Sequence, residues 1–265
     1  MTETADVAAF WEANAETWTR HARAGYDVYR DAHNTPAFLA NLPSVKGLAG
    51  LDIGCSEGSN TRAVAALGAR MTAIDIAPTF IRHAREAEAA QPLGIAYQVA
   101  DGTALPFADA SFDFATAFMS LMDMAAQERG MCEAARVLKP GGFLQFSVLH
   151  PCFAPPGRKV LREPDGTVTG LLITEYFEET AGALERWHFG AAPAEEKAKV
   201  APFTVPRFHR TLESWVGMIV AAGLTIEMLH EPRADAETAA RLPYLADTRI
   251  APLFLHIRAR KALAG

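Results

Sequence analysis

The chain has 265 residues, half of them hydrophobic and 21% charged, a composition typical of a globular protein with a sizeable core. Its net charge of -6 argues against a nucleic-acid partner, because a polyphosphate backbone selects clustered Lys and Arg. No apolar run approaches the roughly 18 residues of a membrane span, and the first residues lack the features of a secretory signal. The three cysteines are isolated from one another, which suits a reducing cytoplasm and gives no metal-ligand spacing.

The first 40 residues predict a helical, aromatic segment in which Asn34-Thr35-Pro36 resembles a helix start, with Asn34 or Thr35 as the cap. Beyond it, apolar runs alternate with helical patterns. The runs that predict strands are 48–53, 70–75, 95–99, 113–118 and 143–149. The helical patterns between them are 61–67, 77–90 and 125–138. This alternation predicts an α/β fold in which a parallel sheet has helices on both faces.

The alternation stops after residue 150. Residues 151–207 are rich in Pro, Gly, aromatic and charged residues, with strand-like runs at 168–177 and 183–189. They predict an insertion that covers the edge of the sheet, not a separate domain. A helix at 212–222 and strands at 224–230 and 252–258 then resume the pattern. Residues 233–250 are expected to form a loop with a short helix.

The segment LDIGCSEGSN, residues 51–60, has the pattern of a strand that turns into a helix around a ligand. Gly54 and Gly58 would let backbone N–H groups approach that ligand, although many such turns contain glycine for packing alone. Asp75 ends the next strand, 17 residues beyond Gly58, where doubly wound folds place a ribose-binding acid. Asp101-Gly102 follow the third strand. These strand ends would meet at the topological switch point and form a binding site.

Four segments together resemble the class I S-adenosylmethionine-dependent methyltransferases. They are LDIGCSEGSNT, MTAIDIA, VADGTALPFADASFDFATAFMSLMDM and EAARVLKPGGFLQFSVLHPC. The resemblance covers residues 48–150 and is nearest to the branch that methylates small molecules, including quinone C-methyltransferases. It implies a Rossmann-like, doubly wound sheet of seven strands with the last one antiparallel. It also implies S-adenosylmethionine as the cofactor and S-adenosylhomocysteine as the product.

The resemblance further implies one domain in four parts. These are an N-terminal helical lid (1–45), a cofactor-binding core (46–150), a substrate-side insertion (151–210) and the C-terminal part of the sheet (211–265). The residues expected around the cofactor come from the lid, the first strand–helix turn and the following strand ends: Tyr26, Arg30, Asp52, Gly54, Cys55, Ser56, Gly58, Asn60, Thr61, Asp75, Ile76, Asp101, Gly102, Thr103, Phe118, Met119 and Met122. Among them, Asp75 is expected to bind the ribose hydroxyls and Asp101 to lie at the adenine.

Ser56 departs from the family pattern, which commonly has Gly at this position. A serine does not easily adopt a positive φ. Its hydroxyl is instead expected to bond the cofactor carboxylate or to cap the following helix.

A sulfonium is already an activated electrophile, so methyl transfer needs alignment, exclusion of water and, for a protonated acceptor, a base. No metal is required. His150 at the end of the fifth strand and His209 before the late helix are candidate bases, although either is equally explained by backbone bonding or packing. Asp123 is another candidate base or substrate contact, with helix capping as the alternative. The residues expected around the acceptor are Trp18, Tyr29, Asp123, Phe153, Tyr176, Trp187 and Phe208.

Other functions fit less well. A dehydrogenase needs room for a pyrophosphate, which the spacing of Gly54 and Gly58 does not provide. A nucleic-acid or protein methyltransferase is disfavoured by the acidic charge and by FMSLMD standing where an Asn/Asp-Pro-Pro-Tyr-like motif would follow the fourth strand. A protein that binds S-adenosylmethionine without transferring its methyl group remains an alternative. The expected partner is a small molecule with an O, N or C acceptor atom, bound by a monomer or homodimer.

Overall fold

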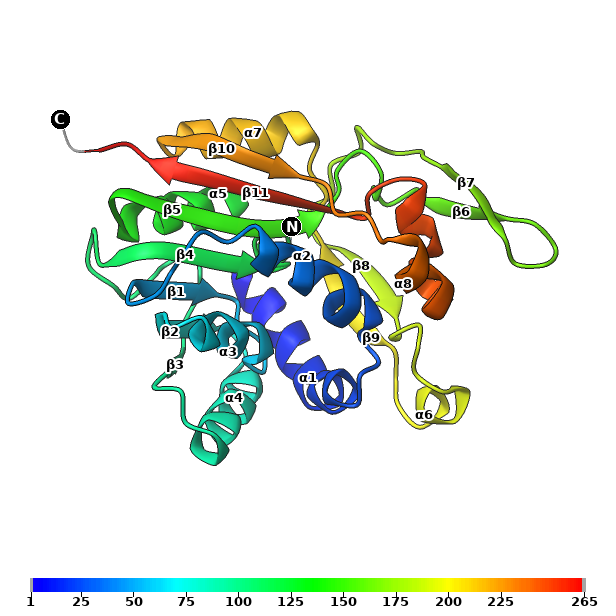
Figure 1. The fold of residues 1–265 in the computed structure, drawn as a ribbon, viewed down its shortest axis with the longest axis horizontal. Helices are drawn as coiled ribbons and strands as arrows, with labels where there is room; N and C mark the ends of the chain where they lie inside the picture. Colours follow the sequence, from blue (N-terminus) through cyan, green and yellow to red (C-terminus); the bar gives the residue numbers. More distant parts are fainter. Residues whose placement is uncertain (1, 264–265) are drawn as a thin grey trace.

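A seven-stranded sheet forms the centre of the computed structural model, which describes residues 2–263 (Figure 1). The strand order is β10-β11-β5-β4-β1-β2-β3. The strands are β1 (Ala49–Ile53), β2 (Arg70–Asp75), β3 (Ala96–Val99), β4 (Phe112–Phe118), β5 (Leu138–Leu149), β10 (Leu224–His230) and β11 (Phe254–Lys261). The first five pair in parallel, whereas β11 runs antiparallel to both β5 and β10. The prediction of a doubly wound sheet with its last strand antiparallel is therefore confirmed.

Helices cover both faces of the sheet, because the central strands are apolar on both sides. On one face α5 (Gln127–Val137) and α7 (Leu212–Ala221) pack through Met131, Trp215 and Ile219. On the other face lie α2 (Thr35–Ala40), α3 (Ser59–Ala66) and α4 (Pro78–Ala90). The chain leaves β1 toward β2 on one side and later adds β4 on the other, so the switch point lies between β1 and β4.

The N-terminal segment contains α1 (Thr4–Arg23), a π-helical turn (Arg30–Asn34) and α2. Proline lies in the first turn of α2 as predicted, but the side chain of Asn34 does not cap the helix. Its amide donates a hydrogen bond to Ser147 Oγ over 3.3 Å, and its Oδ1 lies 2.6 Å from His256 Nε2. Asn34 is buried, so these two partners on the sheet satisfy it and fix α2 to the domain.

The insertion forms two separate hairpins. Its elements are β6 (Lys159–Arg162), β7 (Val168–Leu172), β8 (Ala183–Trp187), α6 (Ala194–Ala198) and β9 (Phe203–Arg207). The sequence predicted two strands here and missed β6, β9 and α6, each of which has only four or five residues. The insertion also does not cover a sheet edge. The hairpin β8–β9 lies beyond the carboxyl ends of the central strands, beside α1 (Figure 1).

The hairpin β8–β9 is fixed to α1 by the buried side chain of Asn14. Its amide donates to Thr204 O over 2.9 Å and its Oδ1 accepts from Thr204 N over 3.3 Å. The predicted loop at 233–250 contains α8 (Ala236–Arg241) and a 3-10 segment (Pro243–Arg249). Among residues 2–263, no helix combines the length and apolarity needed to cross a bilayer.

Candidate active site

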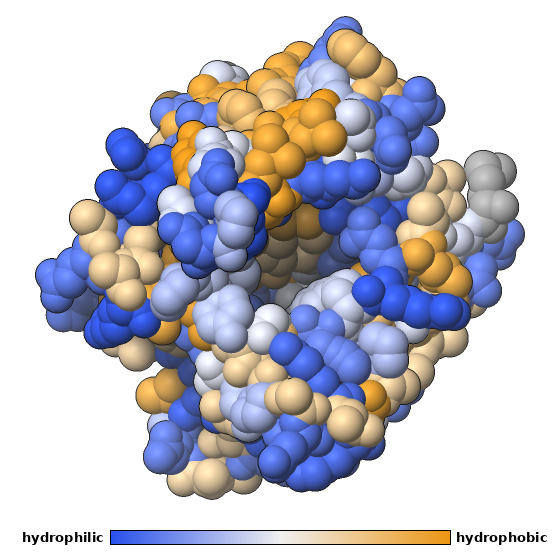
Figure 2. Space-filling model, turned by 90° about the vertical axis from the view of Figure 1, so that its right-hand side faces the viewer, coloured by the Kyte–Doolittle hydropathy of each residue, from blue (hydrophilic) through white to orange (hydrophobic). Residues whose placement is uncertain are grey.

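A cavity of about 630 Å³ lies at the carboxyl ends of β1, β2 and β4. Its walls come from α1, the segment that joins α1 to α2, the loops after the central strands, and the hairpin β8–β9. Figure 2 shows the surface hollow on the side of the molecule that carries β6, β7 and α8. Ligand pockets in proteins typically measure about 300–1,000 Å³, so this one is large enough for a cofactor and part of an acceptor.

The turn after β1 is shaped by contacts with its neighbours. Gly54 has φ +76°, and a Cβ there would lie 2.3 Å from Ser120 Cβ, so only glycine fits. Ser56 also adopts a positive φ, 52°, contrary to expectation. Its N–H donates to Asp75 Oδ2 over 2.8 Å, and its hydroxyl donates to Glu57 Oε2 over 2.8 Å. The Asp75 carboxyl thus holds Ser56 in the left-handed conformation, and the Ser56 hydroxyl bonds Glu57 without capping α3.

Two predicted cofactor residues of this turn do not line the cavity, and a third is held beneath it. Gly58 precedes α3 with φ +87°, and a Cβ there would lie 2.7 Å from Tyr97 Oη, so its role is close packing. The Thr61 hydroxyl donates to Asp52, whose other oxygen accepts from Thr116 over 2.8 Å. Burial raises the pKa of Asp52 to about 6 despite these bonds. Asp52 therefore supports the turn from below, although part of it reaches the cavity.

The acids after β2 and β3 lie where the sequence predicts them. Asp75 lines the cavity and accepts from the backbone N–H groups of Ser56 and Ala77, and burial raises its pKa to about 6. Asp101 also lines it and accepts from both the N–H and the hydroxyl of Thr103. The other predicted cofactor residues that line the cavity are Tyr26, Arg30, Gly54, Cys55, Ser56, Asn60, Ile76, Gly102, Thr103, Phe118, Met119 and Met122.

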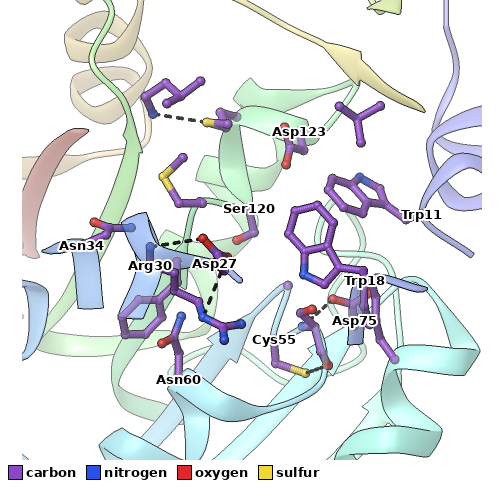
Figure 3. A pocket seen from close by; sticks show the side chains of 18 of the residues that line it. Trp11, Trp18, Asp27, Arg30, Asn34, Cys55, Asn60, Asp75, Ser120 and Asp123 are labelled. Carbon is purple, nitrogen blue, oxygen red and sulfur yellow. Dashed lines mark hydrogen bonds and ion pairs between the residues drawn. The ribbon is translucent and has the colours of Figure 1, made fainter. Parts of the chain in front are cut away.

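A cluster of charges surrounds Arg30 at one end of the cavity (Figure 3). Arg30 Nη1 lies 2.9 Å from Glu57 Oε1, and Arg30 Nε lies 2.7 Å from Asp31 Oδ1. Asp27 accepts from the backbone N–H of Arg30 over 3.2 Å, and burial raises its pKa to about 6. Sequence reasoning missed Asp27 and Glu57. Asp27 lies shortly before Arg30 in the sequence, and Glu57 lies within the glycine turn. These positions could have identified both residues as candidates.

The aromatic end of the cavity is formed by side chains of α1 and the hairpin β8–β9, and Asp123 lines the cavity as well. Trp18 packs edge-on against Trp11 and Trp187, with ring centroids 5.4 and 5.3 Å apart. Tyr29 lines the cavity as well, and its hydroxyl donates to a backbone carbonyl. Burial raises the pKa of Asp123 to about 8. The cavity residues here that the sequence did not predict are Trp11, Arg158, Glu185 and Arg207.

The two predicted catalytic histidines lie outside this cavity. His150 is buried, with Nε2 2.8 Å from Glu231 Oε1 and Nδ1 accepting from Cys152 N over 3.2 Å. His209 Nε2 lies 2.9 Å from the backbone oxygen of Tyr176, and the ring lines a separate cavity of about 20 Å³. Neither histidine lines the cavity, so their positions do not support the prediction that either is a base, and the hydrogen bonds of both rings fit the structural alternative.

Three predicted acceptor residues are also outside the cavity. Phe153 packs on the His150 ring at 4.8 Å, and Tyr176 packs near His209 at 6.3 Å. Phe208 is buried beside the small second cavity. All three lie within residues 151–210, in parts of that segment that turn away from the cavity, although they were expected to line it.

Comparisons with known proteins agree with this geometry. A family described as "Methyltransferase domain" matches residues 51–146. The demethylmenaquinone methyltransferase of Tropheryma whipplei (strain Twist) is 31% identical over 190 residues, which cover 70% of this chain and 78% of that protein. The malonyl-[acyl-carrier protein] O-methyltransferase of Pseudescherichia vulneris is 32% identical over 189 residues, 71% of each chain. The crystal structure of an S-adenosylmethionine-dependent methyltransferase from Mesorhizobium loti superposes with a TM-score of 0.67 at 26% identity, covering 85% of this chain and 96% of that one.

Proposed function

The chain belongs to the class I S-adenosylmethionine-dependent methyltransferases, and on that premise we propose that it methylates a small molecule bound in the cavity beside the cofactor. It is an enzyme whose cofactor is S-adenosylmethionine and whose product is S-adenosylhomocysteine. The observation that carries the proposal is that one cavity joins the strand-end loops to the aromatic walls of α1 and β8–β9. An acceptor in that space is surrounded by protein, which suits a compact molecule better than a polymer.

The donors and acceptors around the cavity fit the cofactor. Asp75 retains lone pairs for the ribose hydroxyls, because its two backbone bonds leave each carboxylate oxygen with one more acceptor site. Asp101 and Gly102 would lie at the adenine. A Cβ at Gly102 would lie 2.5 Å from Met124 Cε, so a larger residue there would displace that side chain. When bound, the cofactor supplies a methyl group on a cationic sulfur.

The methionine part of the cofactor would face Arg30 and its acids. Arg30 is committed to Glu57 and Asp31, and Asp27 lies beside it. Carboxylates outnumber cations around Arg30, so this part of the cavity would attract the cofactor ammonium, and the positive charge of Arg30 would favour the cofactor carboxylate.

The aromatic end would hold the acceptor. Trp18 and Trp187 exclude water from the acceptor, which aids an in-line displacement. The names of the two relatives refer to demethylmenaquinone and to a malonyl group on an acyl-carrier protein, and neither name refers to a nucleic acid. The acceptor atom is an O, N or C nucleophile.

Calorimetry tests the cofactor, and a product assay tests the acceptor. The protein should bind S-adenosylmethionine and S-adenosylhomocysteine but not NAD. In a coupled assay for S-adenosylhomocysteine release, a panel of phenols, quinols, carboxylic acids and amines should contain a substrate, and duplex DNA, tRNA and mixed peptides should not. Turnover with a macromolecule and with no member of the small-molecule panel would overturn the proposal.

A further inference from the structure

Seven acidic side chains line the cavity, and their hydrogen bonds separate one from the other six. The six whose oxygens accept a hydrogen bond are Asp27, Asp52, Glu57, Asp75, Asp101 and Glu185. Asp123 is the seventh, and within residues 2–263 no group donates a hydrogen bond to its carboxyl. The Asp123 side chain is partly exposed and lines the cavity, so a molecule bound there can reach its carboxyl group. Asp123 is therefore available to a ligand.

The fold places Asp123 beside the cofactor turn. It ends a 3-10 turn (Leu121–Asp123) directly after β4, and its N–H donates to Ser120 O over 3.0 Å. Ser120 itself touches the glycine turn, where its Cα lies 3.7 Å from the position of a Gly54 Cβ. Asp123, Ser120 and Asp75 all line the cavity, and Figure 3 shows them around it. Asp123 thus lies between the cofactor turn and the aromatic acceptor end.

The charges near Asp123 come from the insertion. Arg207 on β9 and Glu185 on β8 both line the cavity. The two side chains form an ion pair, with Arg207 Nη1 3.3 Å from Glu185 Oε2. Arg207 also donates to the backbone oxygen of Ala154. Because Arg207 is shared between Glu185 and that carbonyl, it does not offset the burial of Asp123. Burial raises the pKa of Asp123 to about 8, against the attraction of Arg207, so the ligand-free enzyme keeps the group protonated at neutral pH.

We propose that Asp123 is the proton acceptor of the methyl transfer, because among residues 2–263 it is the one cavity carboxyl group to which no protein group donates a hydrogen bond. This inference rests on the proposed function. An opposite charge within about 4–6 Å lowers the pKa of a carboxyl by about 1–3 pH units, enough to ionise Asp123 near pH 7.

The proposal defines a substrate class, because it requires an acceptor that loses a proton. The nucleophilic atom of the acceptor bonds the methyl carbon as the carbon–sulfur bond breaks, and that bonding pair remains on sulfur. The proton of the acceptor passes to an Asp123 oxygen and later to water. Hydroxyl, thiol, acidic carbon and protonated amine acceptors fit this scheme. Free carboxylates and tertiary amines do not, since they have no proton to lose.

Two other ionisable groups of the cavity are weaker candidates. Asp27 accepts from the backbone of Arg30, and its second oxygen lies 3.9 Å from Arg30 Nε, so it is engaged at the other end. His188 lines the cavity, and its two ring nitrogens are buried without a partner among residues 2–263. Because neither nitrogen is reachable by solvent, an acceptor cannot deliver a proton to this ring without a rearrangement.

Calorimetry in two buffers of different ionisation enthalpy tests the proposal without an acceptor. At pH 7, S-adenosylmethionine should release close to one proton on binding the wild type, and S-adenosylhomocysteine should release none. The Asp123→Asn variant should lose that release. Its preference for S-adenosylmethionine over S-adenosylhomocysteine should fall about tenfold at pH 8, with the affinity for S-adenosylhomocysteine unchanged within about twofold. Asp165→Asn, the same change in the exposed β6–β7 turn, is the matched control and should behave as wild type.

Equal proton release with both ligands, or release that persists in Asp123→Asn, would overturn the inference. A parallel loss of affinity for both ligands in that variant would overturn it as well, because that result indicates a structural role. If neither ligand binds the wild type, the proposed function itself fails. These outcomes are distinct, so the two claims are tested separately.

Discussion

Replacing Asp123 by Asn should stabilise the ligand-free enzyme at neutral pH, whatever it does to catalysis. An unfolded aspartate ionises near its ordinary pKa of 3.8, whereas burial raises the pKa of Asp123 in the folded protein to about 8. Below pH 3.8 both states hold the proton, and the side chain has no pH-dependent effect. Above it the unfolded state gives up its proton while the folded state keeps it. The free energy of unfolding therefore falls as pH rises, until the folded group also ionises.

The size of this effect follows from the two pKa values. Each pH unit between them lowers the free energy of unfolding by about 1.4 kcal/mol. At pH 7 the sum is about 4 kcal/mol, and water that enters the cavity reduces it, so we expect about 2–4 kcal/mol. Asparagine has nearly the same shape and does not ionise. It removes this penalty, an example of a functional group that weakens the fold around it.

Urea unfolding of wild type and Asp123→Asn at pH 5, 6, 7 and 8 measures the effect. The variant should be more stable, and its advantage should grow steadily with pH. Asp27, Asp52 and Asp75 titrate in both proteins, so their contributions cancel in the difference between the two free energies of unfolding at each pH. A constant difference across this range, or a variant less stable than wild type, would refute the reasoning.

Three further substitutions test the site. Asp75→Ala should weaken binding of both cofactor forms by about 1–3 kcal/mol, since the ribose loses its acceptor; unchanged affinity in calorimetry would exclude that role. Asn14→Ala removes two hydrogen bonds to Thr204 between α1 and β9, so stopped-flow fluorescence should show faster release of S-adenosylhomocysteine, and an equal rate would mean that α1 is no lid. His150→Gln should lower the free energy of unfolding by about 1–2 kcal/mol, because the contact with Glu231 is lost, and should leave the affinity for the cofactor unchanged. A large loss of cofactor affinity would instead indicate that His150 takes part in the site.

The cofactor end of the site could be predicted from the sequence, because its signals are local. A glycine turn after an apolar run and an acid at the next strand end are short patterns, and a parallel sheet brings such ends together. Asp75 and Asp101 line the cavity for this reason. The left-handed Ser56 was not predicted, since its conformation depends on a bond to Asp75 across the sheet.

The acceptor end depends on contacts that no local pattern encodes. His150 and His209 follow or precede elements that end near the cavity, yet Glu231 and the Tyr176 carbonyl hold their rings elsewhere. The hairpin β8–β9 pairs residues some 20 positions apart and then lies on α1, which brings Arg207 to Asp123.

The sequence by itself determined the order of the strands and helices of the central sheet, the cofactor turn and its acids, because hydrophobic periodicity and glycine act within a few residues. Only the tertiary structure decided which ionisable groups face the cavity and which are paired. Pairing and burial set the protonation of a side chain, and both arise from segments that are distant in the chain. Asp123 is identifiable in the sequence, but its lack of a partner is a property of the fold.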